Sequence, residues 1–225
     1  MSWRNFDWAG FLTNFIAVVL GIAITFGGEE LISSWHDRNE ARESLQLVAE
    51  ELRDNLAMLQ YADSVVQKNQ EAGDFMLRYF GRYDEAPEDS FAMHYNVVAS
   101  YGKLSASTDA LELMKSSNIF IEIDDQELSL DIIHAYVALK QMMDFYSYLV
   151  DEKEADQNAL MASETYKKVM DLRKGNDEKT RRDVIFASRE WQKLITDLEN
   201  DTQGFDIAET DTMINKALKG IEEFN

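Results

Sequence analysis

The stretch LQLVAEELRDNLAMLQYADSVV, residues 45–66, indicates the fold most directly. Its apolar residues recur at alternating steps of three and four, the spacing that places side chains on one face of an α-helix. Asn55 falls on the same face, so this heptad interface has one polar member. Two uses fit the pattern: packing inside the chain's own bundle, or a coiled coil with a second copy. The interface residues are Leu45, Val48, Leu52, Asn55, Leu59, Ala62 and Val66.

Upstream, residues 8–28 read WAGFLTNFIAVVLGIAITFGG and hold no charged side chain. A helix of this length spans roughly 31 Å, close to the ~30 Å hydrocarbon core of a bilayer. Trp3 and Trp8 lie where interfacial aromatic residues anchor a spanning helix, and Glu29 and Glu30 end the apolar run. The stretch therefore predicts a single transmembrane helix.

Two other interpretations of residues 8–28 remain. The first is a buried core helix, although such a helix normally shows one polar face. The second is a cleaved signal peptide, with Thr25 and Gly27 as the small residues at the cleavage site, although the region before the apolar run has one basic side chain, Arg4.

Four small residues recur at every fourth position of this stretch and so share one stripe of the expected helix. Such a stripe lets a second helix approach closely, which predicts self-association or pairing with another membrane protein. Small residues are also common in spanning helices that do not associate. The four residues are Thr13, Ala17, Gly21 and Thr25.

The charge balance restricts the partners. The 42 acidic residues against 22 Lys and Arg give a net charge of −20, so phosphate repulsion argues against nucleic acid as a partner. There is no cysteine, which excludes disulfides and thiolate metal sites. Lys and Arg counts beside residues 8–28 do not decide the orientation. The more acidic flank after the span favours a cytoplasmic N-terminus and a body outside the cytoplasm.

Downstream, the only proline, Pro87, marks a loop at residues 81–90. The chain then divides into three parts. The short N-terminus and the span cover residues 1–28, the long amphipathic helix covers 29–80, and the rest of an acidic helical bundle covers 81–225. A short helix is expected at about 91–101, followed by a turn at Gly102. Asp109 is expected to cap the next helix, and Asp124 to cap a long helix that runs to about Arg173. Further helices are expected from Asp177 and after a cap at Thr210 or Asp211. Strand signals are nearly absent. The predicted class is all-α: a transmembrane helix continuing into a long helix packed in a bundle.

Two elements carry a resemblance to a known family. The first is the end of the apolar stretch, LGIAITF (20–26), followed by Trp35 and the charged segment HDRNEARESLQLVAEELRDNL (36–56). The second is STDALELMKSSNIFIEIDDQELSLDIIHAY (107–136). They are similar to a bacterial family of single-pass inner-membrane proteins of unknown function. The resemblance implies a location in the bacterial inner membrane and supplies no catalytic residues.

No motif for chemistry stands out. His36, His94 and His134 are far apart, and Asp131 with His134 forms only half of a two-step metal motif. We therefore expect no catalytic, cofactor or metal residues, and no enzyme. The sequence favours a membrane-anchored interaction or scaffold protein, an oligomer or an accessory subunit. The alternative is an extracytoplasmic ligand-sensing helical module that acts through a partner.

Overall fold

The computed structural model describes the backbone of residues 8–100, 102–117, 123, 125–172 and 183–224. Side chains are described from residue 39 onward within these ranges, except at 169, 170 and 172. Every regular element in them is a helix, and the helices pack together as a bundle. The predicted all-α bundle is confirmed.

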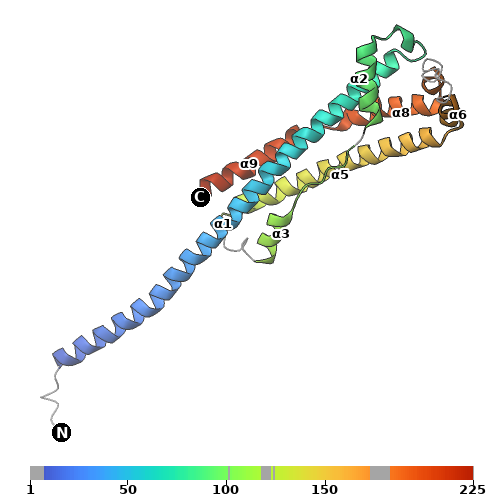
Figure 1. Cartoon of the computed structure of the whole chain (residues 1–225). Helices are drawn as coiled ribbons and strands as arrows, with labels where there is room; N and C mark the ends of the chain where they lie inside the picture. Colours follow the sequence, from blue (N-terminus) through green and yellow to red (C-terminus); the bar gives the residue numbers. More distant parts are fainter. Residues whose placement is uncertain (1–7, 101, 118–122, 124, 173–182, 225) are drawn as a thin grey trace.

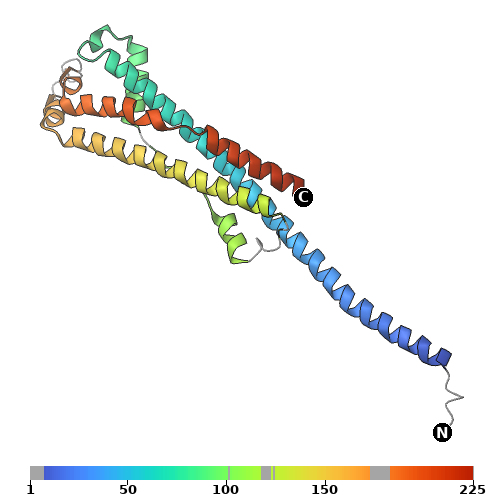
Figure 2. The same cartoon turned by 180° about the vertical axis from the view of Figure 1, so that it is seen from behind.

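The longest helix, α1, runs from Trp8 to Arg78 without a break. Residues 29–72 contain neither proline nor glycine, so no residue there interrupts the backbone hydrogen bonds. The chain turns after α1 at Gly81, whose φ of 78° is a left-handed conformation that glycine adopts without steric cost. Figures 1 and 2 show the first part of α1 projecting away from the other helices, which pack along its second part.

The predicted transmembrane segment falls in the projecting part of α1. Among the described residues, no helix has a stretch both apolar and long enough to cross a bilayer. Residues 8–28 lie outside the described side chains, and so do the four small residues Thr13, Ala17, Gly21 and Thr25. The transmembrane helix and its association stripe therefore stay predictions.

A second long helix, α5 (Gln126–Ala162), runs parallel to α1. The direction follows from the contacting pairs, whose residue numbers increase together along both helices. Tyr136 bonds to Glu51, and further along Lys153 bonds to Asn69. Parallel neighbours cannot be joined by a tight turn, so the chain must travel back along the bundle before α5 begins.

The return path contains two short helices and an extended stretch. After η2 (Tyr83–Glu85), α2 (Glu88–Ala99) packs on α1, and residues 102–108 then run without helical structure to α3 (Asp109–Ser116). Figure 1 shows this green part of the chain returning beside α1 and α5. The turn expected at Gly102 is therefore part of an extended connection.

The third rod of the bundle runs antiparallel to α1. Here the residue numbers of the contacting pairs increase along one helix and decrease along the other. Arg53 bonds to Glu222, whereas Gln60, further along α1, bonds to Asp211. The rod is broken in the middle, and its parts are α8 (Arg189–Asn200), η4 (Asp201–Gly204) and α9 (Ala208–Phe224).

Two apolar clusters fill the bundle. The larger one joins α1 from Ala41 to Val66 to α5 from Leu128 to Val150, and to α3 and α9. The smaller one lies at the far end and is rich in aromatic rings, with Trp191 of α8 packed against Phe186 and Tyr95. The Trp191 indole donates a hydrogen bond to the Tyr83 hydroxyl at 3.0 Å. Burial raises the pKa of Tyr83 to about 12.

Several helix boundaries differ from those expected. Asp125 caps α5 by accepting from the backbone N–H groups of two residues, whereas Asp124 lies outside the described residues. Asp109 is the first residue of α3, and Thr108 is its N-cap. The long helix does not reach Arg173: α5 ends at Ala162, Ser163 takes an extended conformation, and α6 (Glu164–Leu172) follows.

The C-terminal helices also begin elsewhere. Asp177, where a helix was expected to begin, lies outside the described residues. Ser188 separates α8 from the helical turn before it and caps the N–H of Trp191. The last helix begins at Ala208, one turn earlier than expected.

Candidate functional site

The seven heptad positions lie inside the chain's own core. All are at most 5% exposed, and the six apolar ones belong to the cluster shared with α5, α3 and α9. They contact the same chain, so the structure uses them for intramolecular packing. They are Leu45, Val48, Leu52, Asn55, Leu59, Ala62 and Val66.

The polar member, Asn55, binds the backbone of the return path. Its amide nitrogen donates to the carbonyl of Ser107 at 2.8 Å, and its amide oxygen accepts from the N–H of Ser107 at 2.9 Å. The side chain thus pairs with an extended backbone much as a neighbouring strand would. We call residues 97–110, which α1 and α5 hold in this way, the crossover segment.

Glu51, one turn before Asn55, holds the same segment. Its carboxylate accepts from the Ser107 hydroxyl at 2.6 Å, from the N–H of Ala110 at 3.1 Å and from the Tyr136 hydroxyl at 2.5 Å. Burial alone would raise the pKa of Glu51, but these hydrogen bonds together outweigh it and lower the pKa. Burial, and then the bond to Glu51, raise the pKa of Tyr136. Glu51 therefore stays ionised while it fixes the crossover segment.

Three polar residues of α5 bind the upstream part of the crossover segment. The Tyr146 hydroxyl donates to the carbonyl of Gly102 at 2.8 Å. Lys153 and Gln157 donate to the carbonyls of Val97 and Val98 at 2.8 and 2.6 Å. The last carbonyls of a helix lose their regular helical partners. The Val97 carbonyl also accepts from the N–H and the hydroxyl of Ser100, and the buried side chains of α5 supply further hydrogen bonds to this end of α2.

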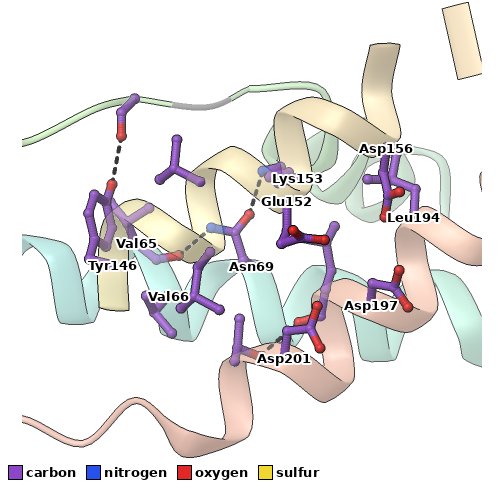
Figure 3. A pocket seen from close by; sticks show the side chains of 15 residues that line it. Val65, Val66, Asn69, Tyr146, Glu152, Lys153, Asp156, Leu194, Asp197 and Asp201 are labelled. Carbon is purple, nitrogen blue, oxygen red and sulfur yellow. Dashed lines mark hydrogen bonds between the residues drawn. The ribbon is translucent and has the colours of Figure 1, made fainter. Parts of the chain in front are cut away.

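Lys153 is the most unusual of these residues because its ammonium group is buried. Figure 3 shows it reaching from α5 to Asn69 of α1, whose amide oxygen accepts its hydrogen bond at 2.6 Å. No salt bridge joins it to a carboxylate among the residues that the structure describes. Burial lowers the pKa of Lys153 to about 8. The interior between α1 and α5 thus holds a cation with neutral partners.

A cavity between α1, α5 and α8 adjoins Lys153 (Figure 3). Its volume is about 40 Å³, room for only a few water molecules. Acidic side chains reach it from α5 and α8, and Lys193 bridges two of them, Asp156 and Asp197, at 2.5 and 2.6 Å. These two bonds raise the pKa of Lys193. The cavity is too small for an organic ligand.

Two larger hollows flank the crossover segment. One, of about 350 Å³, lies between the segment and α1, with Tyr146 of α5 in its wall. The other, of about 320 Å³, lies between the segment and α5. Both are in the size range of ligand pockets. The crossover segment therefore spans the groove between the two long helices without filling it.

The histidines are dispersed. His36 lies outside the described side chains, His94 stacks on Phe75 with ring centroids 4.3 Å apart, and His134 is exposed on α5. Burial lowers the pKa of His94. Asp131 binds Lys216 at 2.9 Å. Within the described ranges, no three His, Cys, Asp or Glu side chains are grouped so that they could hold a metal ion.

Sequence reasoning found Asn55 but missed its partner and the other residues that bind the crossover segment. A signal for two of them was present. The buried stripe of α5 that includes Met143, Tyr146 and Val150 continues at the same spacing to Lys153 and Gln157. Polar residues at core positions require internal partners, so this stripe already implied a buried polar contact.

Comparisons with protein families, with curated proteins and with solved structures find no match for this chain. The fold and the groove beside the crossover segment are therefore the basis for a functional proposal.

Proposed function

We propose that the chain is a membrane-anchored helical interaction protein of the bacterial inner membrane that assembles with copies of itself or with another membrane protein and performs no catalysis. The observation that carries the proposal is the continuity of α1. One unbroken helix joins the uncharged residues 8–28 to the bundle. Such a helix fixes the bundle rigidly to whatever holds its first part.

The geometry of α1 gives the bundle a defined height. The other helices pack along the second part of α1 (Figure 1), in which Ala41 is buried. Ala41 follows Gly28 by 13 positions along α1, which corresponds to about 20 Å of rise. A bundle on such a stalk stands clear of the headgroups and reaches partners that also protrude from the membrane.

Alkaline carbonate extraction of membranes from cells that express the full chain tests the anchor. We expect the protein to stay in the membrane pellet. Changing Val18→Asp together with Ile22→Asp should release it, because each acid at the centre of a spanning helix costs about 3 kcal/mol. The matched control, Val18→Leu with Ile22→Leu, should remain in the pellet. Release of the unmodified chain would contradict the proposal.

Orientation can be tested because the chain has no cysteine. Ala57 is exposed on α1, so an Ala57→Cys variant presents one accessible thiol on the bundle. We propose that the bundle lies outside the cytoplasm, and we expect a membrane-impermeant maleimide to label spheroplasts. Labelling that requires lysis would place the bundle in the cytoplasm.

The interaction role is tested by isolating the full chain from native membranes in mild detergent. Cross-linking and mass spectrometry should find an oligomer or a co-purifying membrane protein. A strictly monomeric particle without a partner would refute the scaffold function. Exposed apolar residues do not locate the interface, because the stripe of Leu130, Ile133 and Val137 on α5 is small for a binding patch.

The second candidate is ligand sensing through a partner. It is favoured by the hollows beside the crossover segment, because that segment is bonded both to α1 and to α5. A ligand that enters a hollow would act on the contact between the anchored helix and its parallel neighbour. Ligand-dependent hydrogen exchange in residues 97–110 would support this function over a scaffold role.

A further inference from the structure

The hollow between the crossover segment and α1 has an unusual lining for this protein. Its described walls are apolar or neutral except for one cation, Lys68. No carboxylate lines it, although the whole chain has 42 acidic residues. The lining residues are Tyr61, Val65, Lys68, Asn69, Val97, Ser100, Gly102, Leu104 and Tyr146.

Lys68 also lacks an acidic partner in the part of the chain that the structure describes. Seven of the described lysines form salt bridges with nearby acids. Lys68 forms none with any described residue, and the next residue, Asn69, has its amide engaged by Val65 and Lys153. An exposed ammonium at the edge of a hollow without carboxylates is available to an anionic ligand.

The other walls suit a flat apolar group. Tyr61 is 57% exposed, whereas Tyr146 is almost fully buried. Burial, and then the Tyr61 phenol, raise the pKa of Tyr146, and both residues line the hollow. Val65, Val97 and Leu104 complete an apolar surface.

The other two cavities do not combine these features. The inner cavity holds about 40 Å³ and is lined by four acids. In the hollow against α5, Lys140 is already paired with Asp144 at 2.6 Å. The hollow at Lys68 therefore combines the size, an exposed aromatic ring and a positive charge that no described acid neutralises.

We infer that this hollow binds a small aromatic carboxylate, with Lys68 holding the carboxylate and the exposed ring of Tyr61 flanking the ring of the ligand. This inference rests on the second proposed function, ligand sensing. The ligand would lie against the crossover segment at Gly102, which is bonded to Tyr146. Glu51 and Asn55 connect the same segment to α1.

Isothermal titration of the full chain in detergent with sodium benzoate tests the site. Benzamide is the matched uncharged probe. We expect saturable benzoate binding and at least about tenfold weaker benzamide binding, because a hydrogen bond to a charged partner contributes about a factor of ten or more. Equal affinity for the two probes, or no saturable benzoate binding, would overturn the inference.

Variants localise the binding. Lys68→Gln should weaken benzoate at least about tenfold, and Tyr61→Ala should weaken it about threefold or more. Both side chains are exposed, so the fold should persist. Lys140→Gln, in the opposite hollow, is the matched control and should bind as the unmodified chain does. Loss of binding in Lys140→Gln with none in Lys68→Gln would refute the assigned site.

Hydrogen exchange tests separately whether benzoate binds and whether its binding affects the crossover segment. Benzoate should slow exchange in residues 97–110 of the unmodified chain and not in Lys68→Gln. Benzoate binding without any change there would keep the site and refute sensing. Failure of benzoate to bind would remove the site and leave the membrane anchor, which carbonate extraction measures, unaffected.

Discussion

Replacing Asn55 by leucine tests whether this buried polar residue serves the crossover segment or pairing between copies. Asn55 is 1% exposed, and its two hydrogen bonds to Ser107 measure 2.8 and 2.9 Å. A leucine would extend the apolar heptad pattern and remove both bonds. In a coiled coil between copies, such a change stabilises the helices and alters the oligomeric state.

The structure predicts that Asn55→Leu destabilises the protein. Two hydrogen bonds contribute about 1 kcal/mol each, and the half-buried N–H and carbonyl of Ser107 would lose their partners. The expected loss in the free energy of unfolding is therefore about 2–3 kcal/mol. For a protein of this size each kcal/mol corresponds to about 2–4 °C in Tm, so the Tm should fall by roughly 4–12 °C.

Thermal melting followed by circular dichroism of the full chain in detergent measures this change. Hydrogen exchange should also become faster in residues 102–108. Asn215→Leu is the matched control, because Asn215 is exposed and its amide bonds only to Asp211 one turn away. The control should change stability by less than about 0.5 kcal/mol. A higher Tm for Asn55→Leu, or a new oligomeric state, would refute the reasoning.

Two further predictions concern the interior of the bundle. Burial lowers the pKa of Lys153 to about 8 in the folded chain, so between pH 8 and about 10.5 the unfolded chain holds a proton that the folded chain has lost. The free energy of unfolding should therefore rise with pH over that window, by up to roughly 3 kcal/mol. In Lys153→Met, the rise in Tm with pH should be smaller. Gly73→Ala should cost about 1–2 kcal/mol in urea unfolding, because its Cβ would lie 3.0 Å from backbone atoms of α8. Gly220→Ala should cost less than half as much, since its Cβ would meet the movable end of the Leu128 side chain; equal costs would contradict this account of the packing.

The sequence predicted the elements that periodicity alone determines. The heptad positions of α1 and the apolar stripe of α5 lie in the core because their spacing matches the helical repeat. It did not predict that α5 runs parallel to α1, since local periodicity carries no information about direction. Without that direction the return path could not be inferred, and Gly102 was expected to form a turn.

The candidate site depended on contacts between distant residues. Asn55 and Ser107 are 52 positions apart in the chain. Periodicity therefore identified Asn55 as a polar residue on an apolar helix face, but it could not identify Ser107 as its partner. Lys68 looked like any exposed lysine of an amphipathic helix, because its missing acidic partner is a property of the folded surface. The end of α5 was missed because Ser163 is not a strong helix breaker, although its hydroxyl caps the N–H of Tyr166 at 3.1 Å.

The membrane anchor is the central claim, and electron paramagnetic resonance tests it most directly. A spin label attached to a Val19→Cys variant, reconstituted into lipid vesicles, reports which solvent surrounds the middle of residues 8–28. We predict high accessibility to oxygen and low accessibility to a water-soluble nickel complex, with the reverse for a label at Ala57→Cys. Low accessibility to both reagents at position 19 would place that residue in a protein interior and contradict the anchor.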